Sequence, residues 1–133
     1  MKKLLYLILA ITLFTACSSD DDPETNQGYT SFVVFHNENV NLTNCIAAYK
    51  RDNKYYKLGE LGNLTKGKYS PEISLASLSF PITEIYIFSD YNGVIRFDDV
   101  YKLNQNTKNI ITIKSGTKGI EVKDKTDPTQ YPQ

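Results

Sequence analysis

The hydrophobic positions of this chain form one long run at the N-terminus and many short runs after it. Leu4 to Phe14 is apolar except for Thr12, whereas the later runs are short and separated by Gly, Pro, Asn and Asp. No apolar stripe with the helical spacing follows the first run, so we expect strands in the rest of the chain. The predicted strands cover residues 29–36, 45–50, 54–58, 69–75, 82–89, 94–97, 109–113 and 120–123.

Turn residues between these runs predict how the strands are joined. Arg51-Asp52-Asn53 separates two predicted strands, and Asp90-Tyr91-Asn92-Gly93 follows the clearest strand of the chain. Asn-Gly accepts the positive φ that tight hairpin turns require, so both segments predict hairpins. Ser115–Gly119 predicts a further turn, which makes residues 109–113 and 120–123 a last hairpin.

Other segments are expected to interrupt or end the pattern. Gly59 and Gly62 should break the strand that begins at Lys54, and Asp98-Asp99 should interrupt the strand that begins at Val94. Val100 to Leu103 is compatible with a short strand or with a helical turn. Residues 124–133 contain Pro128 and Pro132 and are expected to form a disordered tail.

The spacing of the strands predicts the fold class. About seven to eight short strands at regular intervals indicate an all-β protein, an antiparallel β-sandwich that spans residues 29–123. The outline is similar to immunoglobulin-like and transthyretin-like sandwiches found on bacterial envelope lipoproteins. This similarity concerns only the number and spacing of strands, so it implies a fold and no particular function.

The N-terminal segment has the layout of a secretory signal peptide. Lys2 and Lys3 precede the apolar run, which is too short for a spanning helix. The stretch from Leu13 to Cys17 resembles the lipobox of bacterial lipoproteins, with Phe14 departing from the usual Leu. The resemblance implies that residues 1–16 are removed and that Cys17 is acylated; an ordinary signal with a chance Cys is the alternative. More than one acyl chain is needed for stable anchoring, and the family's multiply acylated Cys provides it.

An acidic run follows the expected lipidation site. Ser18, Ser19, Asp20, Asp21 and Asp22 resemble the export signal that sends some lipoproteins to the outer face of the Gram-negative outer membrane. The alternative is a solvated tether, because charged runs cannot bury a core. Either interpretation makes residues 17–28 a lipidated acidic linker in front of the domain.

Composition excludes several classes of function. The 15 basic and 15 acidic side chains balance, so no basic nucleic-acid footprint is present. If Cys17 is lipidated, Cys45 has no partner for an internal disulfide. One His and no C-x-x-C motif argue against a zinc site, and we expect neither a metal nor a cofactor.

Three groups of residues could carry chemistry, and each has a simpler explanation. His36 and Cys45 would form a dyad only if the adjacent strands paired directly. Asp98 and Asp99 should point to opposite faces of a strand and so cannot share one substrate. Oxygen ligands around the central hairpin could bind calcium, and the candidates are Asp90, Asn92, Asp98 and Asp99. The turn itself already explains Asp90 and Asn92, because tight turns favour these residue types. We therefore expect no catalytic residues and no enzyme.

Tyrosines are the best candidates for ligand contact. The sequence contains 10 Tyr, 6 Phe and no Trp. Exposed Tyr side chains offer a rigid apolar face with a polar tip, and basic side chains surround the first group; the alternative is plain packing between strands. The candidate ligand-contact residues are Tyr49, Tyr55, Tyr56, Tyr91 and Tyr101.

These observations favour a non-catalytic binding module, anchored by lipid to the outer membrane and facing the cell exterior. Its ligand would be an extracellular glycan or a protein. The alternatives are a structural, immunity-type or assembly-subunit lipoprotein and, with less support, a small envelope hydrolase.

Overall fold

The described part of the chain is built from strands in two sheets. The computed structural model describes residues 28–114 and 119–133. Within them the strands are β1 (Ser31–Asn37), β2 (Leu42–Arg51), β3 (Lys54–Leu64), β4 (Ile73–Ser74), β5 (Glu84–Tyr91), β6 (Val94–Lys102), β7 (Lys108–Lys114) and β8 (Ile120–Glu121). The prediction of an all-β sandwich is confirmed.

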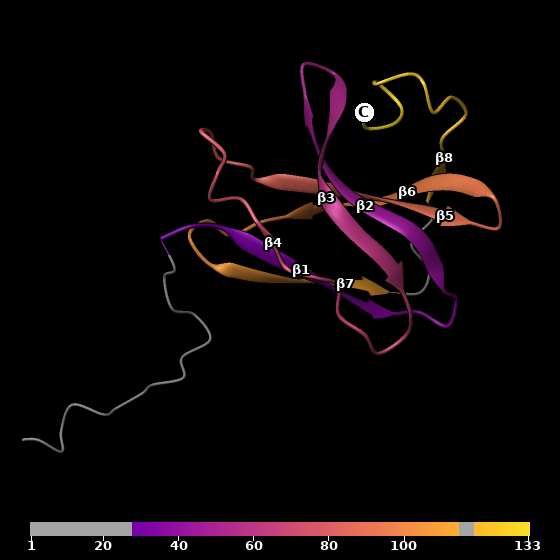
Figure 1. Cartoon of the computed structure of the whole chain (residues 1–133), viewed down its shortest axis with the longest axis horizontal. Coiled ribbons are helices and arrows are strands. Elements are labelled where there is room, and N and C mark those ends of the chain that lie inside the picture. Colours follow the sequence, from indigo (N-terminus) through magenta and orange to yellow (C-terminus); the bar gives the residue numbers. More distant parts are fainter. Residues whose placement is uncertain (1–27, 115–118) are drawn as a thin grey trace, which may run out of the picture.

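The two sheets lie over one another as layers (Figure 1). The small sheet has the order β4-β1-β7 and the large sheet has the order β3-β2-β5-β6-β8. All pairings are antiparallel except that of β1 with β7, which is parallel from Ser31↔Lys108 to Asn37↔Lys114. The sandwich is thus not wholly antiparallel: after β5 and β6 of the large sheet, the chain returns to the small sheet as β7, which lies beside β1 and runs in the same direction.

Side-chain alternation explains the two-sided apolar strands. In β5, Ile85 and Ile87 face the small sheet, while Phe88 belongs to a second apolar cluster on the outer face. The inner cluster joins β1 and β7 to the large sheet and forms the main core. Its members include Phe32, Val34, Cys45, Ala47, Leu61, Leu64, Ile85, Ile87, Ile111 and Ile113.

The two predicted hairpins β2–β3 and β5–β6 are confirmed. Asp52 and Asn53 have φ values of 49° and 61°, and Asn92 and Gly93 have values of 52° and 77°. Two consecutive residues with positive φ are typical of the tight turn whose twist matches paired strands. Asp90 also accepts a hydrogen bond from the Gly93 backbone N at 3.0 Å, which fixes the second turn.

Several predicted strand breaks are wrong because bulges absorb them. β3 continues through Gly59 and Gly62 to Leu64, with an irregular register opposite Cys45 and a φ of 72° at Gly62. β6 likewise continues through Asp98-Asp99, since these two residues stand opposite the single residue between Tyr86 and Phe88. The sequence left open whether residues 100–103 form a short strand or a helical turn. They continue strand β6, which ends at Lys102.

Two other connections differ from the sequence prediction. Only Ile73 and Ser74 of the segment 69–75 form a strand, because the residues before them cover β1 through single contacts such as the Phe35↔Tyr69 bridge. β8 does not form a hairpin with β7. It pairs with β6, through Arg96↔Glu121 and Phe97↔Ile120, and so belongs to the other sheet.

The C-terminal residues 124–133 pack on the large sheet, contrary to the predicted disordered tail. Tyr131 lies 5.7 Å from Phe88 between ring centroids, and the backbone N of Tyr55 donates to Pro128 O at 2.8 Å. Asp124 and Asp127 accept hydrogen bonds from Thr126 and Thr129. Prolines and short Asx turns thus shape an ordered cover for the outer aromatic face.

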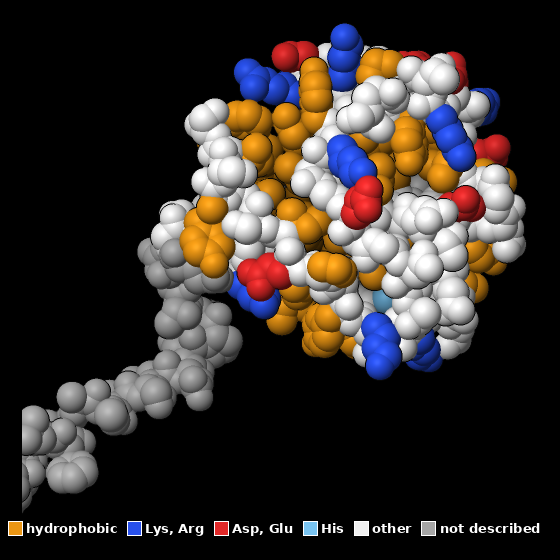
Figure 2. Space-filling model, viewed as in Figure 1, with side chains coloured by type: hydrophobic (Ala, Val, Ile, Leu, Met, Phe, Trp, Pro, Cys, Tyr) orange, Lys and Arg blue, Asp and Glu red, His pale blue; other side chains and the backbone are white. Residues whose placement is uncertain are grey.

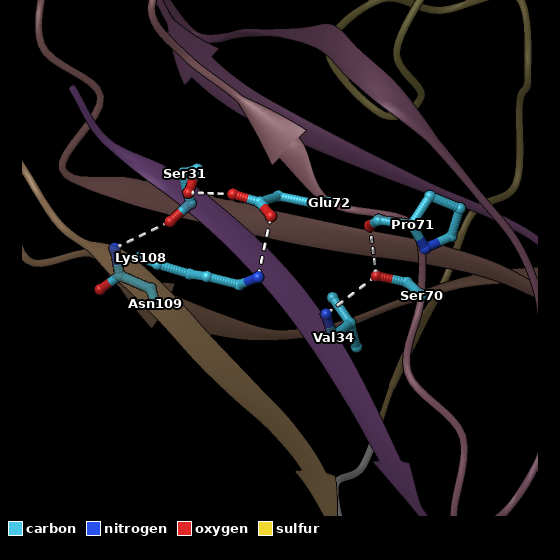
Figure 3. A network of polar contacts seen from close by, with 7 residues as sticks. All are labelled: Ser31, Val34, Ser70, Pro71, Glu72, Lys108 and Asn109. Atoms are coloured by element: carbon cyan, nitrogen blue, oxygen red, sulfur yellow. Dashed lines mark hydrogen bonds and ion pairs between the residues drawn. The ribbon is translucent and has the colours of Figure 1, made fainter. Parts of the chain in front are cut away.

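A polar network ties the small sheet together (Figure 3). Glu72 accepts hydrogen bonds from Ser31 Oγ at 2.6 Å and from Lys108 Nζ at 2.8 Å. The Lys108 contact, then the Ser31 contact, holds the pKa of Glu72 below its ordinary value. Asn109 Nδ2 donates to Ser31 O at 3.1 Å. This network joins β1 and β7 to the segment that leads into β4.

Candidate binding site

The candidate site lies where the β2–β3 hairpin meets the segment that enters β5. Figure 2 shows apolar side chains gathered between these two parts of the chain, with Lys and Arg side chains near the hairpin tip. In the hairpin, Tyr49 pairs with Tyr56. Their rings stack with centroids 5.3 Å apart and an interplanar angle of 22°. Tyr56 is 39% exposed, so the stack is open to solvent on one side.

Phe80 completes the aromatic cluster. Its ring centroid lies 5.6 Å from that of Tyr49, and the Arg51 guanidinium lies over it at 5.0 Å. A cation over an aromatic face is attracted by the ring quadrupole, which orients Arg51 across Phe80. Phe80 was not among the contact residues predicted from the sequence, which were all tyrosines. Its position could have indicated it, because Phe80-Pro81 directly precedes a strong strand and so belongs to an exposed connector.

Two hollows open beside this cluster. One has a volume of about 260 Å³ and is lined by Tyr29, Leu78, Gln105 and others; the second has about 210 Å³ and is lined by Tyr49, Arg51, Glu84 and others. Both include Phe80, Pro81 and Ile82 in their walls. Gln105 Nε2 donates to Ile82 O at 2.8 Å and steadies this shared wall. Shallow hollows beside flat aromatic rings suit a ligand that lies along a surface.

Only two of the five predicted tyrosines meet at this site. Tyr55 is buried on the outer face among Tyr86, Phe88 and Phe97, where burial and then Tyr86 raise its pKa. It lies between Tyr56 and Lys54 in sequence, but alternation along β3 sends it to the other face.

The other two tyrosines lie elsewhere in the large sheet. Tyr91 packs against the main core at the far end of β5, with the Arg96 guanidinium 5.6 Å from its ring. Tyr101 also packs against the main core, from β6. The sequence could not separate these roles, because each tyrosine sits in a similar alternating run.

The residues considered for covalent chemistry lie in the interior. β1 and β2 are in different sheets, so the direct pairing that a dyad required does not occur. His36 Nε2 donates to Val40 O at 2.6 Å, and the thiol of Cys45 lies 3.8 Å from Thr43 O. His36 Nδ1 is buried with no hydrogen-bond partner among the described residues.

The described residues contain neither a cluster of metal-ligating side chains nor a membrane-spanning helix. Among residues 28–97, 100–114 and 119–133, no three His, Cys, Asp or Glu side chains lie close enough to hold a metal ion, and the side chains of Asp98 and Asp99 lie outside the described part of the chain. The same ranges contain no helix long and apolar enough to cross a membrane. The predicted lipidation site Cys17 and the predicted export signal Ser18, Ser19, Asp20, Asp21 and Asp22 lie outside the described residues.

No protein family, no curated protein and no solved structure matches this chain. Its function must therefore be argued from its own residues.

Proposed function

We propose that this protein is a non-catalytic saccharide-binding module that is anchored by Cys17 to the outer membrane and faces the cell exterior. The observation that carries the proposal is the stacked Tyr49–Tyr56 pair, which is open to solvent beside two hollows. The C–H faces of a pyranose ring can lie on such aromatic rings, while the phenol hydroxyls remain free to bond ligand hydroxyls.

The packing around the pair supports binding over plain strand stabilisation. Phe80 comes from a connector and not from the sheet, yet it lies against Tyr49 and extends the aromatic surface. A rigid surface assembled from three segments keeps its shape without a ligand, which lowers the ordering cost on binding.

The geometry favours binding over hydrolysis. His36 and Cys45 are buried, and each contacts a nearby backbone carbonyl. The exposed end of the sandwich instead presents aromatic rings and cations. Asp90, named above as a possible calcium ligand, accepts a hydrogen bond from the Gly93 backbone N–H of its own turn.

A saccharide array followed by calorimetric titration tests this proposal. The full-length protein in detergent should bind at least one saccharide class, and Tyr56→Ala should weaken that affinity roughly tenfold. Tyr69→Ala is the matched control, because Tyr69 is 60% exposed but lies against Phe35 of the small sheet, with ring centroids 4.8 Å apart. Equal loss in both variants, or no binding to any saccharide, would overturn the proposal.

The assembly-subunit alternative has one observation in its favour. β7 is an edge strand of the small sheet, and Ile110 on it is 63% exposed. An exposed strand edge can pair with a strand of another chain. Cross-linking through Ile110→Cys to an envelope partner, with saccharide binding absent, would favour this alternative.

A further inference from the structure

Two cations face each other at the tip of the β2–β3 hairpin. Arg51 pairs with Lys54, and Tyr49 pairs with Tyr56 in the same register. Since residues two apart on a strand share a face, both pairs lie on one face of the hairpin. Like charges directly opposite each other lower the stability of paired strands. The fold therefore keeps an unfavourable cation pair beside the aromatic stack.

The neighbouring carboxylate of Asp52 offsets the repulsion between Arg51 and Lys54 only weakly. Asp52 lies 3.7 Å from Arg51 Nε, but the Asp52 side chain is 83% exposed and that of Arg51 is 59% exposed. Ion pairs this open to water contribute little. Lys50 does not add to the pair, because it faces the other side of the hairpin, with Nζ 5.2 Å from the Tyr55 ring centroid. A ligand anion between Arg51 and Lys54 would relieve the repulsion.

We infer that the ligand is an acidic saccharide, a chain of uronic-acid type that lies on the exposed Tyr56 side of the Tyr49–Tyr56 stack and whose carboxylates lie between Arg51 and Lys54. This inference rests on the proposed function and deepens it. A guanidinium can hold a carboxylate with two parallel hydrogen bonds, and Arg51 is already oriented by Phe80.

The hollow of about 210 Å³ beside Phe80 adds a second element of recognition. Its lining includes Arg51, Glu84 and Tyr86; burial, and then the charge of Glu84, raise the pKa of the Tyr86 phenol. Glu84 is the first residue of β5 and lines this hollow together with Lys50 and Arg51 of β2. The ligand's carboxylate would lie toward Arg51, and its neutral hydroxyls could donate to Glu84.

Titration with two forms of one sugar tests the inference directly. The probes are an oligogalacturonate and its methyl ester, which keeps the rings and removes the charge. We expect the full-length protein to prefer the acid form, and Arg51→Gln and Lys54→Gln each to weaken its affinity roughly fivefold. Raising salt from about 50 to about 300 mM should remove most of the preference. Lys66→Gln, beyond the far end of β3, is the control and should bind as wild type.

A stability measurement separates lost binding from lost folding. Lys54→Glu turns the like-charge pair into an opposite-charge pair, so it should raise the thermal midpoint of the unliganded protein while abolishing the preference for the acid form. Equal affinity for acid and ester would overturn this inference and leave the proposed function standing. No binding of any saccharide would overturn both, and binding of acidic peptides in place of sugars would overturn the saccharide assignment.

Discussion

The ring of Tyr131 meets the ring of Phe88 almost at right angles, with centroids 5.7 Å apart and an interplanar angle of 83°. This contact joins the C-terminal segment to the centre of the large sheet. Around it, Tyr55, Tyr86 and Phe97 form a second aromatic cluster on the face opposite the main core. The C-terminal residues thus protect an apolar surface that would otherwise face water.

Removal of this contact should destabilise the protein. We expect Tyr131→Ala to lower the free energy of unfolding by about 1–2 kcal/mol, because a half-buried aromatic ring loses its burial and its edge contact. Urea unfolding of the full-length protein in detergent measures the change. Lys125→Ala, which alters an exposed side chain of the same segment, should change it by less than about 0.5 kcal/mol. Equal effects in both variants would contradict the packing described.

Gly62 should tolerate Asn better than Ala. Its φ of 72° is accessible to Gly, less so to Asn and poorly to other residues, and no atom would crowd an added Cβ. We expect Gly62→Ala to cost about 1 kcal/mol and Gly62→Asn to cost less. Thermal unfolding of the three proteins checks the order. If Ala is as stable as Gly, the bulge opposite Cys45 does not require this conformation.

The Glu72 network should give the protein a weak acid-sensitive stability. Hydrogen bonds from Lys108 and Ser31 lower the folded pKa of Glu72 from its ordinary value of 4.5. Its contribution is therefore present above pH 4.5 and is lost as the pH falls through the folded pKa.

Urea unfolding at neutral and acidic pH can isolate that contribution. Because the Lys108–Glu72 pair is largely exposed, it should amount to less than about 1 kcal/mol. Glu72→Gln should be less stable than wild type at neutral pH and equal to it well below the folded pKa. A constant difference at all pH values would contradict the assignment.

Membrane attachment should depend on Cys17. The lipobox resemblance predicts that wild type is found in the membrane fraction of a Gram-negative host and is digested by protease added to intact cells. Cys17→Ala should leave the membrane fraction, since the acyl chains supply the attachment. Wild type that is membrane-bound but protected would mean that the acidic run is only a tether. Attachment of both forms would contradict the lipid anchor.

The strands and hairpin turns could be predicted because their signals are local. The two-sided apolar run within residues 82–89 and the turn residues Asn92-Gly93 indicate a hairpin without help from the rest of the fold. The parallel pairing of β1 with β7 and the transfer of β8 to β6 depend on contacts between distant residues. Nothing local encodes them, so they were missed or misassigned.

The candidate site was predicted only in part for the same reason. The sequence placed five tyrosines on equal terms, and it took the register of β2 with β3 to show that Tyr49 and Tyr56 share a face while Tyr55 does not. Phe80 joins them through a contact between segments that are distant in sequence. The disordered tail was predicted from its two prolines and its terminal position, but Tyr131 packs against the outer apolar cluster and orders the segment.

The measurement that tests the central claim most directly is an NMR titration of the isotope-labelled full-length protein with the saccharide selected on the array. We predict that the largest backbone shifts fall on Tyr49, Tyr56 and Phe80, with little change at Phe88 and Tyr131 on the opposite face. Shifts centred on Phe88 or Tyr131, or on Ile110 at the β7 edge, would contradict a binding site at the β2–β3 hairpin.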